Sequence, residues 1–192
     1  MSILTPSQAT SILKNLGFRI RNTSDYRQAV RDFQIGWNLG TALVAHGIVG
    51  ARTSDALRLS ESRRRQGKGT VSANFSYVEF RCKCGGRFTT CRRIFIIRVQ
   101  IQHLEAYRKR VGHPVTVVSG FRCPGYNNSV GGATHSQHMV GTACDVPGVL
   151  TLAQVRALRA FTGIGYSSST GRVLHVDSRP GNVNSPAEWK YA

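Results

Sequence analysis

Apolar residues in the first sixty positions recur at the three-to-four-residue spacing of amphipathic helices. The pattern predicts a first helix that starts around Thr5 and ends at Gly17, and a second that Ser24 and Asp25 cap. After a glycine-bounded turn, a short third helix is predicted over residues 53–59. Three short helices bury only a small core, so we expect residues 1–60 to form a three-helix domain of modest stability.

The second part of the chain, residues 75–192, mixes helical and strand patterns. We predict helices over residues 93–111 and 152–161, β-branched strands over residues 115–118 and 172–176, and a loop over residues 125–132. Short strands among helices indicate an α+β domain. The stretch between the two parts, residues 61–74, is polar, basic and glycine-containing, which favours a solvated linker.

Charge narrows the range of partners. The chain has 26 Lys and Arg against 9 Asp and Glu, a formal net charge of +17, spread over both parts. Such a surface attracts polyanions: nucleic acid, an anionic membrane or an anionic cell wall. A nucleic-acid-binding protein would need aromatic platforms or a recognition helix among its basic residues, and the sequence shows neither. We therefore expect no nucleic-acid partner.

Membrane and export signals are also missing from the pattern. The strongest apolar run, Ile94-Phe95-Ile96-Ile97, is far too short to span a bilayer, so we expect no stable membrane insertion. The first residues lack a basic segment followed by an apolar run. The expectation is a monomeric protein made in the cytoplasm without a signal peptide.

Five cysteines lie in the second part of the chain, namely Cys82, Cys84, Cys91, Cys123 and Cys144. An odd number leaves at least one thiol unpaired in a monomer. Cys82, Cys84 and Cys91 also suggest a structural zinc site, but the spacing is not the usual one and no fourth ligand is evident. Disulfides or plain thiols are therefore the expectation, with Cys144 as buried packing.

Two segments contain histidine and aspartate at spacings that suit a metal. His138 and Asp145 lie seven positions apart with small residues between them, so both side chains can reach one ion. His175 and Asp177 occupy alternate positions of a predicted strand and therefore share a face. These spacings alone also fit an ordinary His–Asp pair, and that alternative stays open.

The helical part carries a first family resemblance. Residues 29–34 and the motif from Gly47 to Leu57 resemble the peptidoglycan-binding domain that accompanies many wall hydrolases. His46 departs from that family, which has Asp at this position. The resemblance covers about residues 5–60 and implies wall binding. The same residues, including Phe33 and Ile48, would also serve as the packing skeleton of any three-helix unit.

A second resemblance covers residues 75–181. The motifs that carry it are Ser119-Gly120-Phe121-Arg122, Tyr126-Asn127, Val130-Gly131-Gly132-Ala133, the segment from Ser136 to Asp145, and His175-Val176-Asp177. In this order they are similar to the zinc D-Ala-D-Ala carboxypeptidase family, which includes phage endolysins and peptidoglycan endopeptidases. The resemblance implies a small antiparallel sheet flanked by helices, a hedgehog/DD-peptidase-like fold.

The same resemblance implies a set of site residues. His138, Asp145 and His175 match zinc ligands, and Ser136 matches a residue that supports the first ligand. Arg122 matches the arginine that meets a substrate carboxylate or the carbonyl oxygen under attack.

The general base is less easily assigned. Many relatives place an acid three residues before the last ligand, where this chain has Arg172. Asp177 is the best substitute, because it shares a strand face with His175, and Glu79 is the second choice.

The sequence therefore predicts a zinc-dependent peptidase, of the phage endolysin type, that acts on peptidoglycan and anionic wall polymers at the bacterial cell wall. Two alternatives stay open. One is a non-catalytic wall-binding relative that has lost the base, and the other is a basic protein that binds nucleic acid and uses zinc structurally. The exact scissile bond is not predicted.

Overall fold

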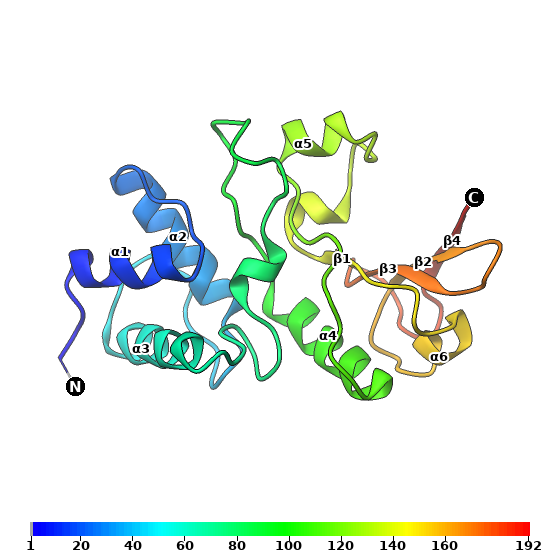
Figure 1. The fold of residues 1–192 in the computed structure, drawn as a ribbon, viewed down its shortest axis with the longest axis horizontal. Coiled ribbons are helices and arrows are strands. Elements are labelled where there is room, and N and C mark those ends of the chain that lie inside the picture. The colour runs from blue at the N-terminus through cyan, green and yellow to red at the C-terminus, as the bar shows by residue number, and fades with distance from the viewer. Residues whose placement is uncertain (1) are drawn as a thin grey trace.

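Three helices come first along the chain: α1 (Pro6–Asn15), α2 (Thr23–Gly36) and α3 (Ala51–Arg65), on the left of Figure 1. The computed structural model describes residues 2–192. Thr5 and Gln8 form a capping box that begins α1 at its predicted place. α2 begins two residues earlier than predicted, because the Asn22 side chain accepts a hydrogen bond from the Asp25 N–H at 2.8 Å.

The loop between α2 and α3 is held by one buried side chain. Gln34 accepts from the Gly47 N–H and donates to the Ile48 carbonyl, both at 2.9 Å. His46, at the family's Asp position, accepts from the Ile48 N–H through Nδ1 at 3.1 Å, as an Asp side chain does in such turns. Phe33 is fully buried as predicted, but the Ile48 side chain is 67% exposed, so its expected packing role is wrong.

Residues 61–74 are packed in part: residues 70–72 are buried, whereas residues 64–68 lie on the surface. α3 continues to Arg65, and Val71 lies in the core with no exposed surface. The Arg63 guanidinium donates to the Gly69 and Ala73 carbonyls, and the Ser60 hydroxyl donates to the Thr70 carbonyl. Polar composition here reflects both exposure to water and internal hydrogen bonds. That residues 61–74 act as a linker between two domains stays a prediction.

The two parts of the chain share one hydrophobic core. Tyr77 is fully buried, and its ring lies 5.2 Å from the rings of both Phe18 and Phe33. Its hydroxyl donates to the Phe33 carbonyl at 2.7 Å. The independence of residues 1–60 and 75–192 as separate domains therefore stays a prediction.

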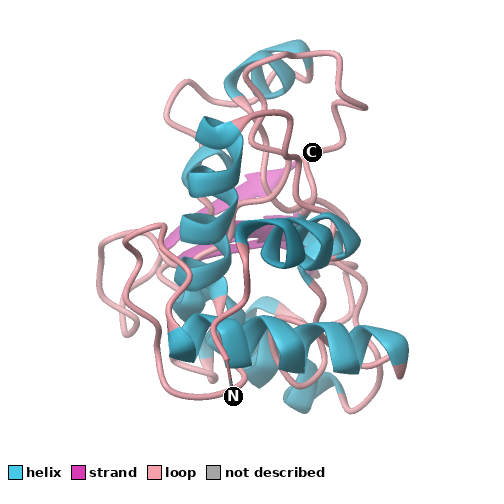
Figure 2. Cartoon of the chain, turned by 90° about the vertical axis from the view of Figure 1, so that its left-hand side faces the viewer, coloured by secondary structure: helices cyan, strands magenta, loops and turns pink. Residues whose placement is uncertain are grey.

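The second part contains a four-stranded sheet and further helices, which confirms the predicted α+β class. Its elements are η1 (Tyr77–Phe80), α4 (Arg98–Val111), α5 (Pro124–Ser129), η2 (Gln137–Val140), β1 (Ala143–Asp145), α6 (Leu152–Arg156), β2 (Gly163–Ser167), β3 (Val173–Asp177) and β4 (Ala187–Tyr191). The strand order is β1-β3-β2-β4. The first three strands in that order are antiparallel, but β4 is parallel to β2, so the sheet is mixed. Figure 2 shows it behind the helices.

Several element boundaries differ from the sequence-based predictions. α4 begins at Arg98 because Arg93 adopts a positive φ of 72° and Ile94 forms a bridge with Arg81, which keeps this stretch out of the helix. Residues 115–118 alternate between buried and exposed positions, yet only the following Ser119 forms a bridge, with Asp145. α6 is shorter than predicted, and the predicted loop over residues 125–132 begins with α5.

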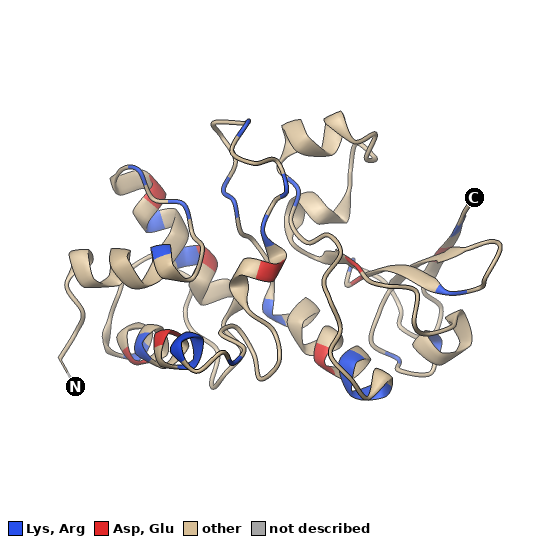
Figure 3. Cartoon of the chain, viewed as in Figure 1, with Lys and Arg blue, Asp and Glu red and all other residues tan. Residues whose placement is uncertain are grey.

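Lys and Arg residues occur on the helical part and on the sheet-containing part (Figure 3). Within residues 2–192, no helix combines the length and the apolar character that crossing a bilayer requires.

Candidate metal centre

Sheet register brings two of the predicted ligands together. β1 and β3 pair so that Asp145 lies directly opposite His175, and side chains at such paired positions share a face. His138 arrives from η2, which immediately precedes β1. Asp145 Oδ1 lies 2.9 Å from His175 Nδ1 and 3.2 Å from His138 Nε2, and the two nitrogens are 3.2 Å apart. Three potential ligand atoms therefore converge on one point.

This triangle has the dimensions of a zinc site. Zinc bonds to nitrogen and oxygen of about 2.0–2.1 Å in tetrahedral geometry place the ligand atoms roughly 3.3 Å apart. The observed separations of 2.9–3.2 Å are close to that value. Burial raises the pKa of Asp145, but hydrogen bonds with His138 and His175 outweigh it and hold the pKa well below its ordinary value. The carboxylate is thus charged and suited to a cation.

Both imidazole rings are held by a hydrogen bond from the ring nitrogen that faces away from the centre. His138 Nδ1 donates to the Gly120 carbonyl at 2.7 Å, which leaves the Nε2 lone pair directed at the centre. His175 Nε2 donates to Asp177 Oδ2 at 3.1 Å, which leaves the Nδ1 lone pair directed at the centre. Histidines that bind metals ordinarily make such an outer hydrogen bond, because it sets the tautomer and the ring orientation.

Asp177 lies behind His175, away from the centre. Its carboxylate has no exposed surface and accepts hydrogen bonds from the Arg179 backbone N–H, Nε and Nη2, besides His175. Burial raises the pKa of Asp177, but the bonds with Arg179 and His175 outweigh it and lower the pKa to about 2. Gly163 of β2 pairs with Asp177 and leaves space for its carboxylate, since a Cβ at Gly163 would lie 2.3 Å from both carboxylate oxygens.

Arg122 reaches the centre from the segment before α5. Its Nη2 donates to Asp145 Oδ2, and its Nε donates to the Ser119 hydroxyl at 3.1 Å. Ser136 lies immediately before η2 and lines the cavity in front of this centre. Glu79, the second choice for the base, instead caps η1 by accepting from the Ser76 N–H at 2.7 Å, and it is not part of the cavity wall.

A cavity of about 720 Å³ opens in front of the three converging atoms. Its lining includes residues that the sequence-based reasoning missed: Arg179, Trp189 and Tyr191. The Trp189 ring lies 5.1 Å from the His175 ring, and the Arg179 guanidinium lies 5.0 Å from the Trp189 ring. Gly165, paired with His175, makes room for these rings, because a Cβ there would lie 2.7 Å from Trp189 Nε1. The alternate positions of Trp189 and Tyr191 in the sequence were the signal that could have identified them as neighbours on one strand face.

Comparison with known proteins places this site in a family. Residues 73–177 match the family described as Peptidase M15, a stretch that includes all of the predicted site residues. The chain is 33% identical over 152 residues to the zinc D-Ala-D-Ala carboxypeptidase of Streptomyces albus G, an alignment that covers 73% of this chain and 56% of that protein. The chain thus spans little more than half the length of this relative. The family expected from the motifs is confirmed: the chain belongs to the peptidase M15 family.

Proposed function

We propose that this chain is a zinc-dependent peptidase that hydrolyses peptide bonds in the stem peptides or cross-links of bacterial peptidoglycan. The observation that carries the proposal is the convergence of His138 Nε2, Asp145 Oδ1 and His175 Nδ1 at the floor of a cavity. The relative from Streptomyces albus G is named for zinc and for the D-Ala-D-Ala bond, which supports both the metal and the substrate class.

The three convergent residues would hold the ion, and the chain's other groups would position it and the substrate. When bound, zinc supplies a Lewis acid that polarises the scissile carbonyl and lowers the pKa of water in the site. Gly120 and Asp177 keep the two imidazoles in the tautomers that zinc requires. Arg122 offers a fixed cationic fork to a substrate carboxylate or to the oxygen that gains charge during attack.

Peptide hydrolysis needs a group, often a carboxylate, that takes a proton from the attacking water. Among the described residues that line the cavity, Asp145 is the only carboxylate, and it faces both histidines and Arg122. Asp177 is buried behind His175, where it has no open path to water in the cavity. We therefore propose that Asp177 positions His175, while its predicted role as general base stays a hypothesis that zinc affinity and turnover can separate.

The cavity favours an anionic peptide. Arg122 and Arg179 line it together with Trp189 and Tyr191, and its volume of about 720 Å³ lies in the range that holds small-molecule ligands. Aromatic rings and guanidinium groups suit a short peptide that ends in, or carries, a carboxylate. A terminal D-Ala and a cross-link to diaminopimelate both meet that description, so we propose carboxypeptidase and endopeptidase substrates alike.

The helical part and the basic surface support a role at the cell wall. Residues 5–60 fold into three helices, as expected for a peptidoglycan-binding unit, and the net charge of +17 attracts anionic wall polymers. We propose that these features keep a monomeric enzyme on its substrate, and that the protein is a phage endolysin that reaches the wall from the host cytoplasm.

The direct test uses purified sacculi. Release of amino groups by the wild-type protein, abolished by a chelator and restored by zinc, is the expected result. His138→Ala should release none under the same conditions. Mass spectrometry of the fragments identifies the bond that is cut. A protein that binds sacculi without releasing amino groups would instead be a non-catalytic wall-binding relative, and stronger binding to DNA than to sacculi at moderate salt would contradict the proposed location.

A further inference from the structure

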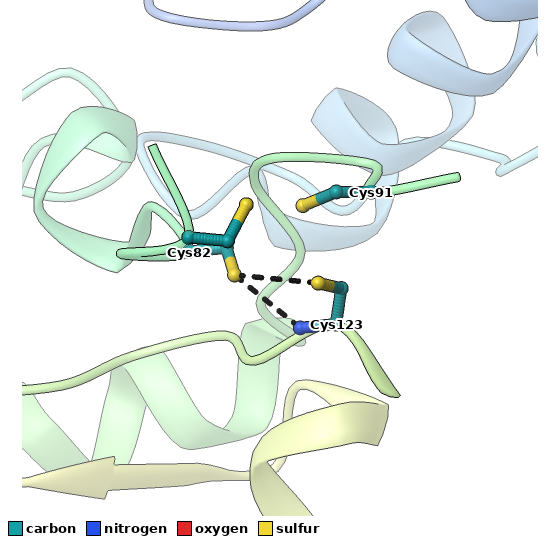
Figure 4. Close-up of side chains that lie close together, drawn as sticks. Cys82, Cys91 and Cys123 are labelled. Carbon is teal, nitrogen blue, oxygen red and sulfur yellow. Dashed lines mark hydrogen bonds between the residues drawn. The ribbon is translucent and has the colours of Figure 1, made fainter. Parts of the chain in front are cut away.

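Four of the five cysteines gather at one point outside the cavity described above. Cys82, Cys84, Cys91 and Cys123 are all buried, and their sulfur atoms lie within 4.8 Å of one another. Each is a free thiol. Figure 4 shows the thiol of Cys82 directed at Cys123, with Cys91 close by. The fifth cysteine, Cys144, lies elsewhere, fully buried in the main core.

The backbone is shaped to bring these thiols together. An antiparallel bridge between Arg81 and Ile94 closes the base of a loop, and the Cys82 N–H donates to the Arg93 carbonyl at 2.7 Å across it. Cys84 lies two residues after Cys82, in a turn over residues 83–86. Gly85 and Gly86 then turn the chain with positive φ angles of 65° and 88°. Cys123 comes from a separate segment, at the start of α5.

The surroundings suit thiolates. The Cys123 N–H donates to Cys82 Sγ at 3.4 Å, and the Arg93 N–H donates to Cys91 Sγ at 3.3 Å. Four thiolates around a divalent ion carry a net charge of −2, which needs nearby positive groups. Four cationic side chains line the cavity beside the cysteines: Arg19, Arg81, Lys83 and Arg93. Outer donors and charges of this kind support metal-bound thiolates.

We propose that Cys82, Cys84, Cys91 and Cys123 bind a second, structural zinc ion. Four cysteine ligands without an open position are typical of structural zinc, whereas a catalytic site keeps a place for water. The sequence suggested such a site at Cys82, Cys84 and Cys91 but offered no evident fourth ligand, because Cys123 lies 32 positions after Cys91. Only the fold shows that it is the fourth ligand.

Such an ion would stiffen a region with little else to hold it. The buried cluster here consists of the four cysteines and Phe121, and the loop from Cys82 to Arg93 contains no regular helix or strand. The segment that carries Cys123 also contains Gly120, which accepts from His138, and Arg122, which contacts Asp145. The structural zinc would therefore anchor the backbone that orients two parts of the catalytic centre.

Metal content of the intact protein tests the proposal without depending on activity. Protein purified in the presence of zinc and then desalted should contain two zinc ions per chain by mass spectrometry of the metal. His138→Ala should contain one, because the cysteine site does not use that residue. Cys91→Ala should also lose one ion, and Cys144→Ala, which removes a thiol outside the cluster, should keep both. Cobalt bound to His138→Ala should show the intense thiolate-to-metal absorption of a tetrahedral sulfur site.

Several results would overturn the proposal, and none requires a cysteine variant to fold. One is a His138→Ala protein that contains no zinc after exposure to the metal. Others are two disulfides among the four cysteines in peptide maps made without reduction, or iron with acid-labile sulfide in place of zinc. Loss of zinc from the catalytic centre alone would instead leave the cobalt spectrum of the cysteine site intact, so failure of the two sites is distinguishable.

Discussion

Replacing Asp177 with asparagine separates the two roles that this residue can have. The carboxylate accepts from His175 and Arg179 through Oδ2, and twice more from Arg179 through Oδ1. Asparagine keeps the shape but turns one oxygen into an NH2 donor. In one orientation this group faces the His175 N–H, and in the other it faces two Arg179 N–H donors. Either arrangement replaces attraction with repulsion in a site that water does not reach.

The expected loss of zinc affinity in Asp177→Asn follows from these contacts. A hydrogen bond to a charged group contributes about 1.5–3 kcal/mol, and loss of an outer partner of a metal ligand lowers metal affinity about 10- to 100-fold, or roughly 1.4–2.7 kcal/mol. The two estimates agree. Asp177→Asn should therefore raise the zinc dissociation constant by one to two orders of magnitude, because His175 is no longer held in the binding tautomer.

Competition with a chromophoric chelator measures that constant, and turnover is then assayed with zinc at saturation. We expect much of the lost activity to return at saturating zinc. Asp55→Asn is the matched control, since the Asp55 side chain is 60% exposed and far from the site in the helical part. Unchanged zinc affinity together with turnover that stays abolished at saturating zinc would refute the positioning role and support the general-base role predicted from sequence.

Three further substitutions test other parts of the account. Gly163→Ala should destabilise the protein by about 1–3 kcal/mol in urea unfolding and weaken zinc binding, since its Cβ would meet the Asp177 carboxylate; wild-type values would disprove the close packing. Arg122→Lys should lower kcat/KM by about 100-fold or more while zinc stays bound, and near-normal kinetics would remove Arg122 from substrate recognition. The Arg64 hydrogen bond lowers the pKa of Glu61, so this carboxylate stabilises the fold above its unfolded pKa and the contribution disappears as pH falls. Glu61→Gln should thus lower the unfolding free energy by about 1 kcal/mol at neutral pH and by progressively less as the pH falls below the unfolded pKa of this carboxyl, and a loss that does not change with pH would contradict this reasoning.

The candidate ligand set came from the family resemblance, because local spacing alone also fits an ordinary His–Asp pair. His175 and Asp177 alternate on one strand, and the structure does place them on one face, joined by a hydrogen bond. What the spacing did not reveal is which ring atom faces which neighbour. His175 uses Nε2 for Asp177 and Nδ1 for the centre, and this choice is the observation behind the positioning role proposed for Asp177.

Most strands around the site could not be predicted from the sequence, for a physical reason. β2 reads Gly-Ile-Gly-Tyr-Ser, a segment with weak strand propensity, yet Gly163 and Gly165 are needed to leave space beside Asp177 and His175. β1 is only three residues long, so its register against β3 is invisible to periodicity. Long-range packing, and not local preference, decides these elements.

In residues 61–74, composition indicated the exposed positions but not the packed ones. Their arginines, serines and glycines are typical of a solvated linker. Arg63, however, donates to the Gly69 carbonyl, and Ser60, just before the segment, donates to the Thr70 carbonyl. Polar side chains that satisfy buried backbone groups cannot be told from exposed ones by composition alone.

The central claim is that one metal ion sits between His138, Asp145 and His175. Anomalous diffraction at the zinc absorption edge, from crystals grown with zinc, tests it most directly. The account predicts a strong anomalous peak within bonding distance of His138 Nε2, His175 Nδ1 and an Asp145 oxygen. Zinc-saturated crystals in which these three side chains diverge, with no peak between them, would contradict it.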